Sequence, residues 1–148
     1  MRRIAYLTDM DVLGKPGLSS ARPRLTARAI LRNPQGLYAI TYTEGFGIHM
    51  LPGGGIENGE SILEALRREI TEETGCTLET ALPLGYVEEN RAHADYTQIS
   101  YYFVCTTRDE TLHPCLTLQE QAHGAKAMWL TLEEMQQRIS EPVFGRAQ

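Results

Sequence analysis

The sequence has few cysteines, and their spacing indicates neither a disulfide framework nor a cysteine-based metal site. Cys76, Cys105 and Cys115 form no C-x-x-C pair and leave an odd number. Reduced thiols in a cytoplasm are the simplest explanation of this usage, so we expect a cytoplasmic protein. A chain of 148 residues is long enough to bury a hydrophobic core without disulfides, and we expect one domain over residues 1–148.

Long apolar runs are also missing. No run approaches the roughly 18 residues that a membrane-spanning helix needs. Arg2 and Arg3 do not introduce a signal peptide, because charged residues such as Asp9, Asp11 and Lys15 follow in place of an apolar segment. With 42% hydrophobic residues, the chain is expected to be a soluble globular protein with no membrane partner.

The sequence also lacks a surplus of basic residues. The formal net charge is −5, which argues against broad binding to nucleic acid, since such binding relies on a basic surface. An anionic small molecule is not excluded by this charge, because metal ions held by carboxylates invert the local sign of the electrostatic potential.

The most informative stretch that is present runs from Leu51 to Cys76, and it opens with a proline and three glycines. We predict that Pro52, Gly53, Gly54 and Gly55 lie outside any regular element, since proline lacks the N–H group and consecutive glycines carry little backbone preference. Such a run brings bare backbone close to a ligand, so the three glycines are candidate substrate-binding residues.

A helix is predicted directly after the glycines. Ser61 and Glu64 form an S-x-x-E capping box at its start, and Gly75 supplies the stop. The helix is therefore expected over Ile62 to Thr74.

Three carboxylates of this helix, those of Glu69, Glu72 and Glu73, are spaced i, i+3, i+4 and share one face. That face overlaps the apolar stripe, which consists of Leu63, Leu66 and Ile70. Clustered carboxylates beside a buried stripe repel one another unless a cation compensates, and oxygen ligands suit Mg²⁺ or Mn²⁺. Taken alone, the acids are equally typical of a solvated helix face carrying a Glu64–Arg68 surface pair.

The full spacing decides between these two interpretations. From Gly54 to Cys76 the chain reads G-x5-E-x7-R-E-I-x-E-E-x-G-C. It resembles the box of the Nudix hydrolase family, G-x5-E-x7-R-E-U-x-E-E-x-G-U, in which U is a bulky aliphatic residue. The sequence departs from that pattern only at Cys76, a small hydrophobe that still suits a buried position.

The resemblance implies a fold, an activity and a set of site residues. The Nudix fold is an α/β/α sandwich with a central mixed sheet, and its enzymes hydrolyse a nucleoside diphosphate linked to another group. By resemblance, Glu69, Glu72 and Glu73 bind Mg²⁺, with Mn²⁺ as the alternative, and the Gly54 carbonyl adds an oxygen ligand. Glu69 is also the first candidate for general base, and Arg68 orients a neighbouring carboxylate.

Other candidate residues lie outside the box. Glu120, in the loop before Trp129, is a second candidate for base or metal ligand, although a solvent-facing acid is an equally good interpretation. Arg91 is a candidate for contact with substrate phosphate or ribose, as is His93, and an ordinary surface loop is the alternative for both. Glu60 is expected to support the loop before the helix.

The choice among substrate classes is narrowed only by two subclass markers that this chain lacks. Family members that hydrolyse ADP-ribose typically carry a proline where this chain has Arg91-Ala92. Diadenosine polyphosphate hydrolases typically carry a tyrosine where it has His93-Ala94. A MutT-like nucleoside triphosphate pyrophosphohydrolase is therefore the leading hypothesis. Hydrolysis of ADP-ribose or a nucleotide sugar stays open, as does a nucleotide-sensing module without turnover. Relatives often dimerise, so a homodimer is a possible assembly.

The rest of the chain is predicted to alternate strands with loops and to end in a helix. Residues 1–23 are expected to be an arm or an edge segment. The expected strands are Leu25–Leu31, Leu37–Thr43, Phe46–Leu51, Leu84–Glu88, Gln98–Thr106 and Lys126–Leu130. Thr131 is predicted to cap a last helix that ends near Ile139.

Overall fold

The computed structural model of the protein describes residues 1–43, 48–108 and 125–140. The elements in these ranges are β1 (Arg3–Thr8), α1 (Asp9–Leu13), β2 (Arg24–Arg32), β3 (Tyr38–Thr43), β4 (Ile48–Met50), β5 (Gly53–Gly55), α2 (Ile62–Thr74), β6 (Leu78–Arg91), the 3₁₀ turn η1 (Ala92–Ala94), β7 (Tyr96–Thr107), β8 (Ala125–Leu130) and α4 (Leu132–Ile139). None of these helices is long and apolar enough to cross a membrane.

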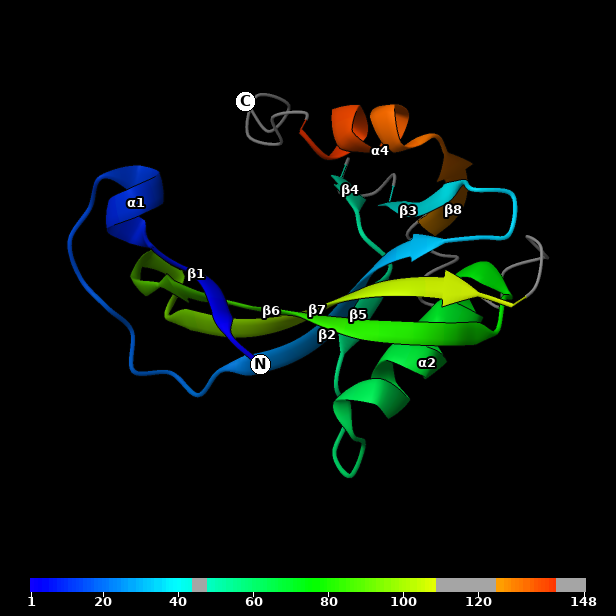
Figure 1. Cartoon of the computed structure of the whole chain (residues 1–148). Helices are drawn as coiled ribbons and strands as arrows, with labels where there is room; N and C mark the ends of the chain where they lie inside the picture. The colour runs from blue at the N-terminus through cyan, green and yellow to red at the C-terminus, as the bar shows by residue number, and fades with distance from the viewer. Residues whose placement is uncertain (44–47, 109–124, 141–148) are drawn as a thin grey trace.

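The described strands form one mixed sheet, and the predicted α/β fold with a central mixed sheet is confirmed. The strand order is β1-β6-β7-β2-β3-β4, with β5 paired to β2 and β8 paired to β3. The central pair, β2 and β7, is parallel over nine residues from Arg24 and Gln98 to Arg32 and Thr106. In Figure 1 the strands lie between α4, at the top, and α2, below.

Helix α2 begins and ends where the sequence predicts. Ser61 accepts a hydrogen bond from the backbone N–H of Glu64 at 3.1 Å, and Glu64 accepts one from the Ser61 N–H at 3.4 Å. Gly75 ends the helix in the left-handed conformation, with φ of 73°. These are local signals, since each one joins residues only a few positions apart.

The hydrophobic core lies between α2 and the centre of the sheet. Leu66 and Ile70 are fully buried there with alternate residues of β2 and β7, namely Ala27, Ala29, Leu31, Phe103 and Cys105. Leu63, which we predicted to belong to the buried stripe, is 48% exposed. It lies in the first turn of the helix, where it lines an open apolar groove with Leu25 and Tyr101 rather than the core.

The glycine run is a strand, which corrects the prediction that it lies outside regular structure. Gly53 to Gly55 form β5 and pair antiparallel with β2, placing Gly53 opposite Arg28 and Gly55 opposite Thr26. Two further backbone bonds of 2.9 Å flank the pairing, from Ala29 N to Pro52 O and from Ile56 N to Leu25 O. The partner strand supplies the hydrogen bonds, and this non-local pairing outweighs the weak local preference of glycine.

Strand β1 is the first strand in the order of the sheet, and the short helix α1 that follows it was not predicted. Strand β1 pairs parallel with the end of β6, from Arg3 opposite Tyr86 to Thr8 opposite Asn90. We expected β6 to end at Glu88, whereas it continues to Arg91 before η1 begins. The parallel partner β1 explains this extra length, because it adds a second ladder of hydrogen bonds to the end of β6.

The expected strands overlap β2, β3, β4, β6, β7 and β8, although β6 begins at Leu78 rather than Leu84. Phe46, the first residue of the strand expected over Phe46–Leu51, lies outside the described residues.

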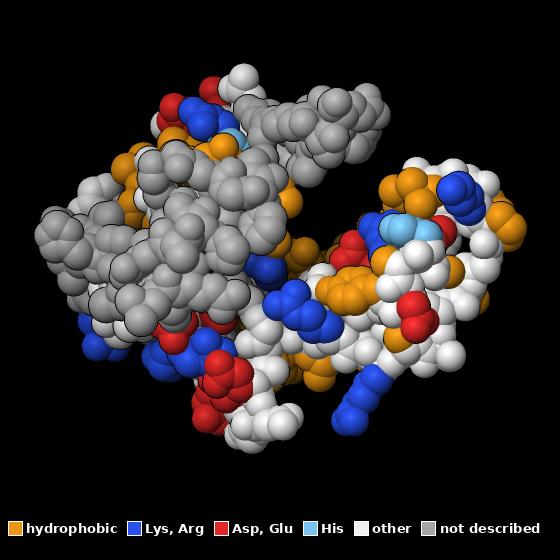
Figure 2. Space-filling view, turned by 180° about the vertical axis from the view of Figure 1, so that it is seen from behind, with side chains coloured by type: hydrophobic (Ala, Val, Ile, Leu, Met, Phe, Trp, Pro, Cys, Tyr) orange, Lys and Arg blue, Asp and Glu red, His pale blue; other side chains and the backbone are white. Residues whose placement is uncertain are grey.

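Residues 33–36 join β2 to β3. These two strands pair only through Arg32 and Tyr38, and the rest of β3 pairs with β4 and β8. Thr131 caps α4 through a capping box with Glu134. Figure 2 views the molecule from behind. A hollow opens beside the part that carries α1, and acidic, basic and histidine side chains lie along it.

Candidate functional site

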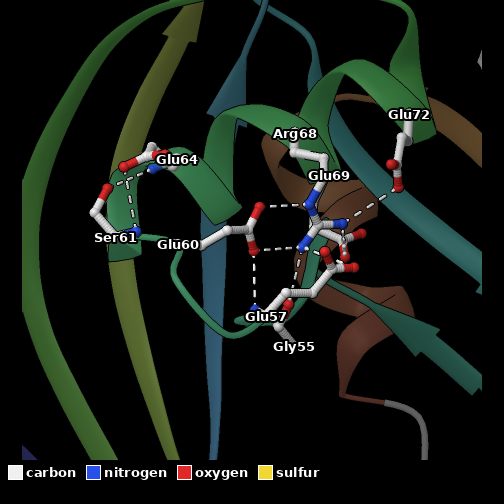
Figure 3. Close-up of polar contacts among 8 residues, drawn as sticks. All are labelled: Gly55, Glu57, Glu60, Ser61, Glu64, Arg68, Glu69 and Glu72. Carbon is white, nitrogen blue, oxygen red and sulfur yellow. Dashed lines mark hydrogen bonds and ion pairs between the residues drawn. The ribbon is translucent and has the colours of Figure 1, made fainter.

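Arg68, at the middle of α2, connects the helix to the loop before it (Figure 3). Its Nε donates to Glu60 Oε2 at 2.7 Å and its Nη2 to Glu60 Oε1 at 2.9 Å, which is the bidentate geometry of a strong arginine–carboxylate pair. Nη2 also donates to the carbonyl of Gly55 at 3.1 Å. Arg68 therefore joins helix, loop and glycine strand into one unit.

The same guanidinium reaches the acids of the helix. Nη1 of Arg68 donates to Glu69 Oε1 at 3.0 Å and lies 3.5 Å from Glu72 Oε2 (Figure 3). The predicted alternative, a Glu64–Arg68 surface pair, is not what the structure shows, because Glu64 is the partner of Ser61 in the capping box. Arg68 thus lies where it can orient the Glu69 carboxylate.

Glu60 supports the loop, as the sequence suggested. The Glu60 carboxylate accepts hydrogen bonds from Arg68 and from the backbone N–H of Glu57, the latter at 2.9 Å. These two hydrogen bonds, the one from Arg68 first, lower the pKa of Glu60 from 4.5 to about 2. The hydrogen bond to Glu60 in turn raises the pKa of Arg68 further above its already high value.

The glycines lie directly against the helix carboxylates. A Cβ atom at Gly54 would stand 2.5 Å from Glu69 Oε1 and 2.7 Å from Glu69 Cδ, so only glycine leaves room for the carboxylate. Glu73 is 7% exposed and accepts a hydrogen bond of 2.8 Å from the backbone N–H of Gly53. The bare backbone that the sequence indicated is therefore next to two of the three predicted metal ligands.

Arg28 of β2 belongs to this site, and sequence reasoning missed it. Its Nη1 donates to the carbonyl oxygens of Leu51 at 2.9 Å and Gly53 at 3.2 Å. Burial lowers the pKa of Arg28, and the negative charge of Glu73 acts in the opposite direction. The only signal in the sequence is a charged residue at an interior position of a predicted strand, which is uncommon unless the charge has partners.

The donor set has the chemistry of a hard divalent cation. Glu69, Glu72, Glu73 and the Gly54 backbone offer oxygen only, and the space that a Cβ at Gly54 would fill lies beside Glu69. In the ranges that the structure describes, no three acidic, histidine or cysteine side chains converge as a metal centre. Instead, Glu69 and Glu72 face Arg68, and Glu73 faces the Gly53 N–H.

The other predicted residues are not brought to this cluster. Glu120 lies outside the described residues. Arg91 is at the end of β6 and donates to Glu89 Oε1 at 2.9 Å. Arg91 pairs with Tyr96 of β7, whereas Gly53 lies opposite Arg28, which pairs with Tyr102 of β7. The six residues from Tyr96 to Tyr102 separate Arg91 from the level of Gly53 by about 20 Å along the strand. Their roles, like those of the box residues, stay predictions.

Comparison with known proteins places this geometry in a family. The family model of the NUDIX domain matches residues 22–146. No curated protein matches the chain. Among solved structures, a NUDIX hydrolase from Nitrosomonas europaea superposes with a TM-score of 0.64 at 23% identity, covering 79% of this chain and 78% of that one.

Two further structures carry MutT in their descriptions. MutT from Bacillus halodurans gives a TM-score of 0.60 at 23% identity, with 78% of this chain and 72% of that chain covered. A study of MutT from Aliivibrio salmonicida and Vibrio cholerae contributes a structure with a TM-score of 0.58 at 24% identity, with coverage of 80% and 87%. At these identities the likeness supports the fold.

Proposed function

The chain belongs to the NUDIX family. We propose that it is a pyrophosphohydrolase that acts on a nucleoside triphosphate, releasing pyrophosphate and a nucleoside monophosphate. The observation that carries this proposal is the contact of the glycine strand with the helix acids, in which Gly54 lies against Glu69 and Gly53 N–H binds Glu73. Backbone groups and oxygen ligands in one place are what a polyphosphate needs.

We assign the metal site to Glu69, Glu72, Glu73 and the carbonyl of Gly54, with Mg²⁺ as the expected ion and Mn²⁺ as the alternative. When bound, such an ion neutralises phosphate charge and lowers the pKa of a water molecule. Arg68 Nη1 lies near Glu69 Oε1 and Glu72 Oε2, so the guanidinium can orient both of these carboxylates.

The protein groups then have separate tasks. The backbone of Gly53 to Gly55 positions the polyphosphate, and Arg68 holds Glu69 in orientation through its 3.0 Å hydrogen bond. Water attacks phosphorus, the anhydride P–O bond breaks, pyrophosphate leaves with the bonding electron pair, and the Glu69 carboxylate accepts the proton of the water. Glu120 is the alternative acceptor of that proton.

The test is product release across a nucleotide panel with Mg²⁺, with Mn²⁺ and with a chelator. The panel contains canonical and oxidised nucleoside triphosphates, ADP-ribose, nucleotide sugars and dinucleoside polyphosphates. We expect metal-dependent release of pyrophosphate from a triphosphate. Preferential turnover of ADP-ribose or a nucleotide sugar would overturn the substrate assignment, and full activity in chelator would overturn the metal assignment.

The setting of the enzyme is also part of the proposal. One sheet contains strands from both ends of the described chain, which supports a single domain over residues 1–148. The two described cysteines, Cys76 and Cys105, are buried thiols outside any disulfide, which supports the proposal of a cytoplasmic protein. We expect no nucleic-acid or membrane partner, and light scattering will decide between a monomer and the possible homodimer.

A further inference from the structure

A row of polar side chains crosses the sheet beyond the candidate site. The polar row consists of Ser100, Gln98, Glu89 and Arg91, from β7 and β6. Gln98 Nε2 donates to Ser100 Oγ and to Glu89 Oε2, both at 3.1 Å, and Arg91 Nη2 donates to Glu89 Oε1 at 2.9 Å. The structure therefore holds these side chains in a fixed order along the sheet.

The polar row is on the face of the sheet away from α2. Ala27 and Ala29 of β2 belong to the core under α2, so Thr26 and Arg28 point to the other face. Thr26 is in register with Ser100, and their side chains share a 2.9 Å hydrogen bond, which places Ser100 on the Arg28 face. Gln98 lies two residues before Ser100 on β7, so its side chain points to the same face of the sheet.

The distance along β7 matches the size of a nucleotide. Arg28, which binds the Gly53 carbonyl, is level with Tyr102. Four residues separate Tyr102 from Gln98, or about 13 Å. That is the length scale of one nucleotide extended from its phosphates to its base. A polyphosphate at the glycine strand would therefore place its nucleoside over the polar row.

The polar row has hydrogen-bonding capacity left for a ligand. Glu89 accepts two hydrogen bonds in the described structure, and a carboxylate accepts about four. Arg91 donates one of five N–H groups to Glu89. The side chains of Glu89 and Arg91 are 26% and 21% exposed, so they are held in place yet reachable.

A hydrogen-bond acceptor next to a hydrogen-bond donor complements the edge of a nucleobase. Carboxylate and guanidinium groups read the N–H and the C=O or ring-nitrogen positions of bases. A second phosphate would be repelled by Glu89, and an apolar group would leave the remaining hydrogen-bonding capacity of both side chains unused. We propose that the polar row binds the nucleobase of the substrate and that Glu89 sets the preference among bases. This inference rests on the proposed function for the placement of the phosphates.

Residues 1–21, which precede the part of the chain matched by the family model, contact the end of the sheet that carries the polar row. Asp9, whose side chain is 2% exposed, accepts hydrogen bonds from His93 N at 2.7 Å and His93 Nδ1 at 2.9 Å. The side-chain amide of Asn90 makes two hydrogen bonds with the backbone of Ser19, of 2.8 and 2.9 Å. Residues 1–21 thus position β6 on either side of Arg91.

The test compares Glu89→Gln with Glu88→Gln. Glu88 is the adjacent carboxylate on the opposite face, where it pairs with Arg3 at 3.5 Å. Binding of AMP, GMP, CMP and UMP is measured by calorimetry, and kcat and KM are measured for the four corresponding triphosphates. The melting temperature of each variant serves as the check on folding.

The expected result is a change of selectivity in Glu89→Gln alone. The preferred monophosphate should bind about tenfold more weakly, since a hydrogen bond to a charged group is lost. The differences in affinity among the four monophosphates should therefore become smaller. For triphosphates, Glu89→Gln should raise KM by a larger factor than it lowers kcat. An unchanged spread in Glu89→Gln, an equal change in Glu88→Gln, or no binding of any monophosphate to the wild type would overturn the inference. Base-selective binding without triphosphate hydrolysis would instead overturn only the proposed function.

Discussion

Replacing Gly54 with alanine should remove activity while leaving the fold intact. The added Cβ would stand 2.5 Å from Glu69 Oε1 and 2.7 Å from Glu69 Cδ, well inside van der Waals contact. The atoms it meets belong to the end of a flexible side chain, so the carboxylate can rotate away at little cost in stability. The rotation displaces Glu69 from Gly54 by about 1 Å, a displacement that typically costs about 100-fold in rate.

The assay is steady-state hydrolysis of the best triphosphate at saturating Mg²⁺, together with thermal unfolding. We expect kcat of Gly54→Ala to fall about 100-fold and its melting temperature to stay near that of the wild type. Gly55→Ala is the matched variant, because its Cβ would meet only the guanidinium end of Arg24 at 3.4 Å. Equal losses in the two variants, or full activity in Gly54→Ala, would refute the reasoning.

Three further predictions concern the scaffold around this contact. Gly53→Ala should destabilise the fold by about 3 kcal/mol or more in urea unfolding, because its φ is +141° and its Cβ would meet backbone, Ala27 O, at 2.0 Å. Ser61→Ala should cost about 1 kcal/mol in the same measurement, since it removes the N-cap of α2. The pKa of Glu60 is lowered, so its contribution to stability is present above pH 4.5 and is lost as the pH falls towards about 2. The difference in melting temperature between wild type and Glu60→Gln should shrink over that interval, and a constant difference would contradict the assignment.

What the sequence predicts well is encoded locally. Helix α2 was predictable because its capping box, its periodicity and its terminal glycine all lie within fifteen residues of one another. The pairing of Glu60 with Arg68 was not predicted, because helix geometry alone favours a surface pair between Arg68 and Glu64.

What the sequence does not predict depends on contacts between distant segments. The glycine run became a strand because β2, some 25 residues earlier, offers its backbone. Arg28 joined the site for the same reason, since its partners are the carbonyls of Leu51 and Gly53. The role of Asp9 depends on His93, 84 residues away in the chain. No local periodicity reports such pairings.

The central claim is that Glu69, against the glycine strand, carries the metal-dependent chemistry. The most direct test is the rate of Mg²⁺-dependent hydrolysis of the best triphosphate by Glu69→Gln, with circular dichroism to verify the fold. The account predicts a folded protein whose turnover falls to the level of the chelator control. A folded Glu69→Gln variant that keeps the wild-type rate would contradict it.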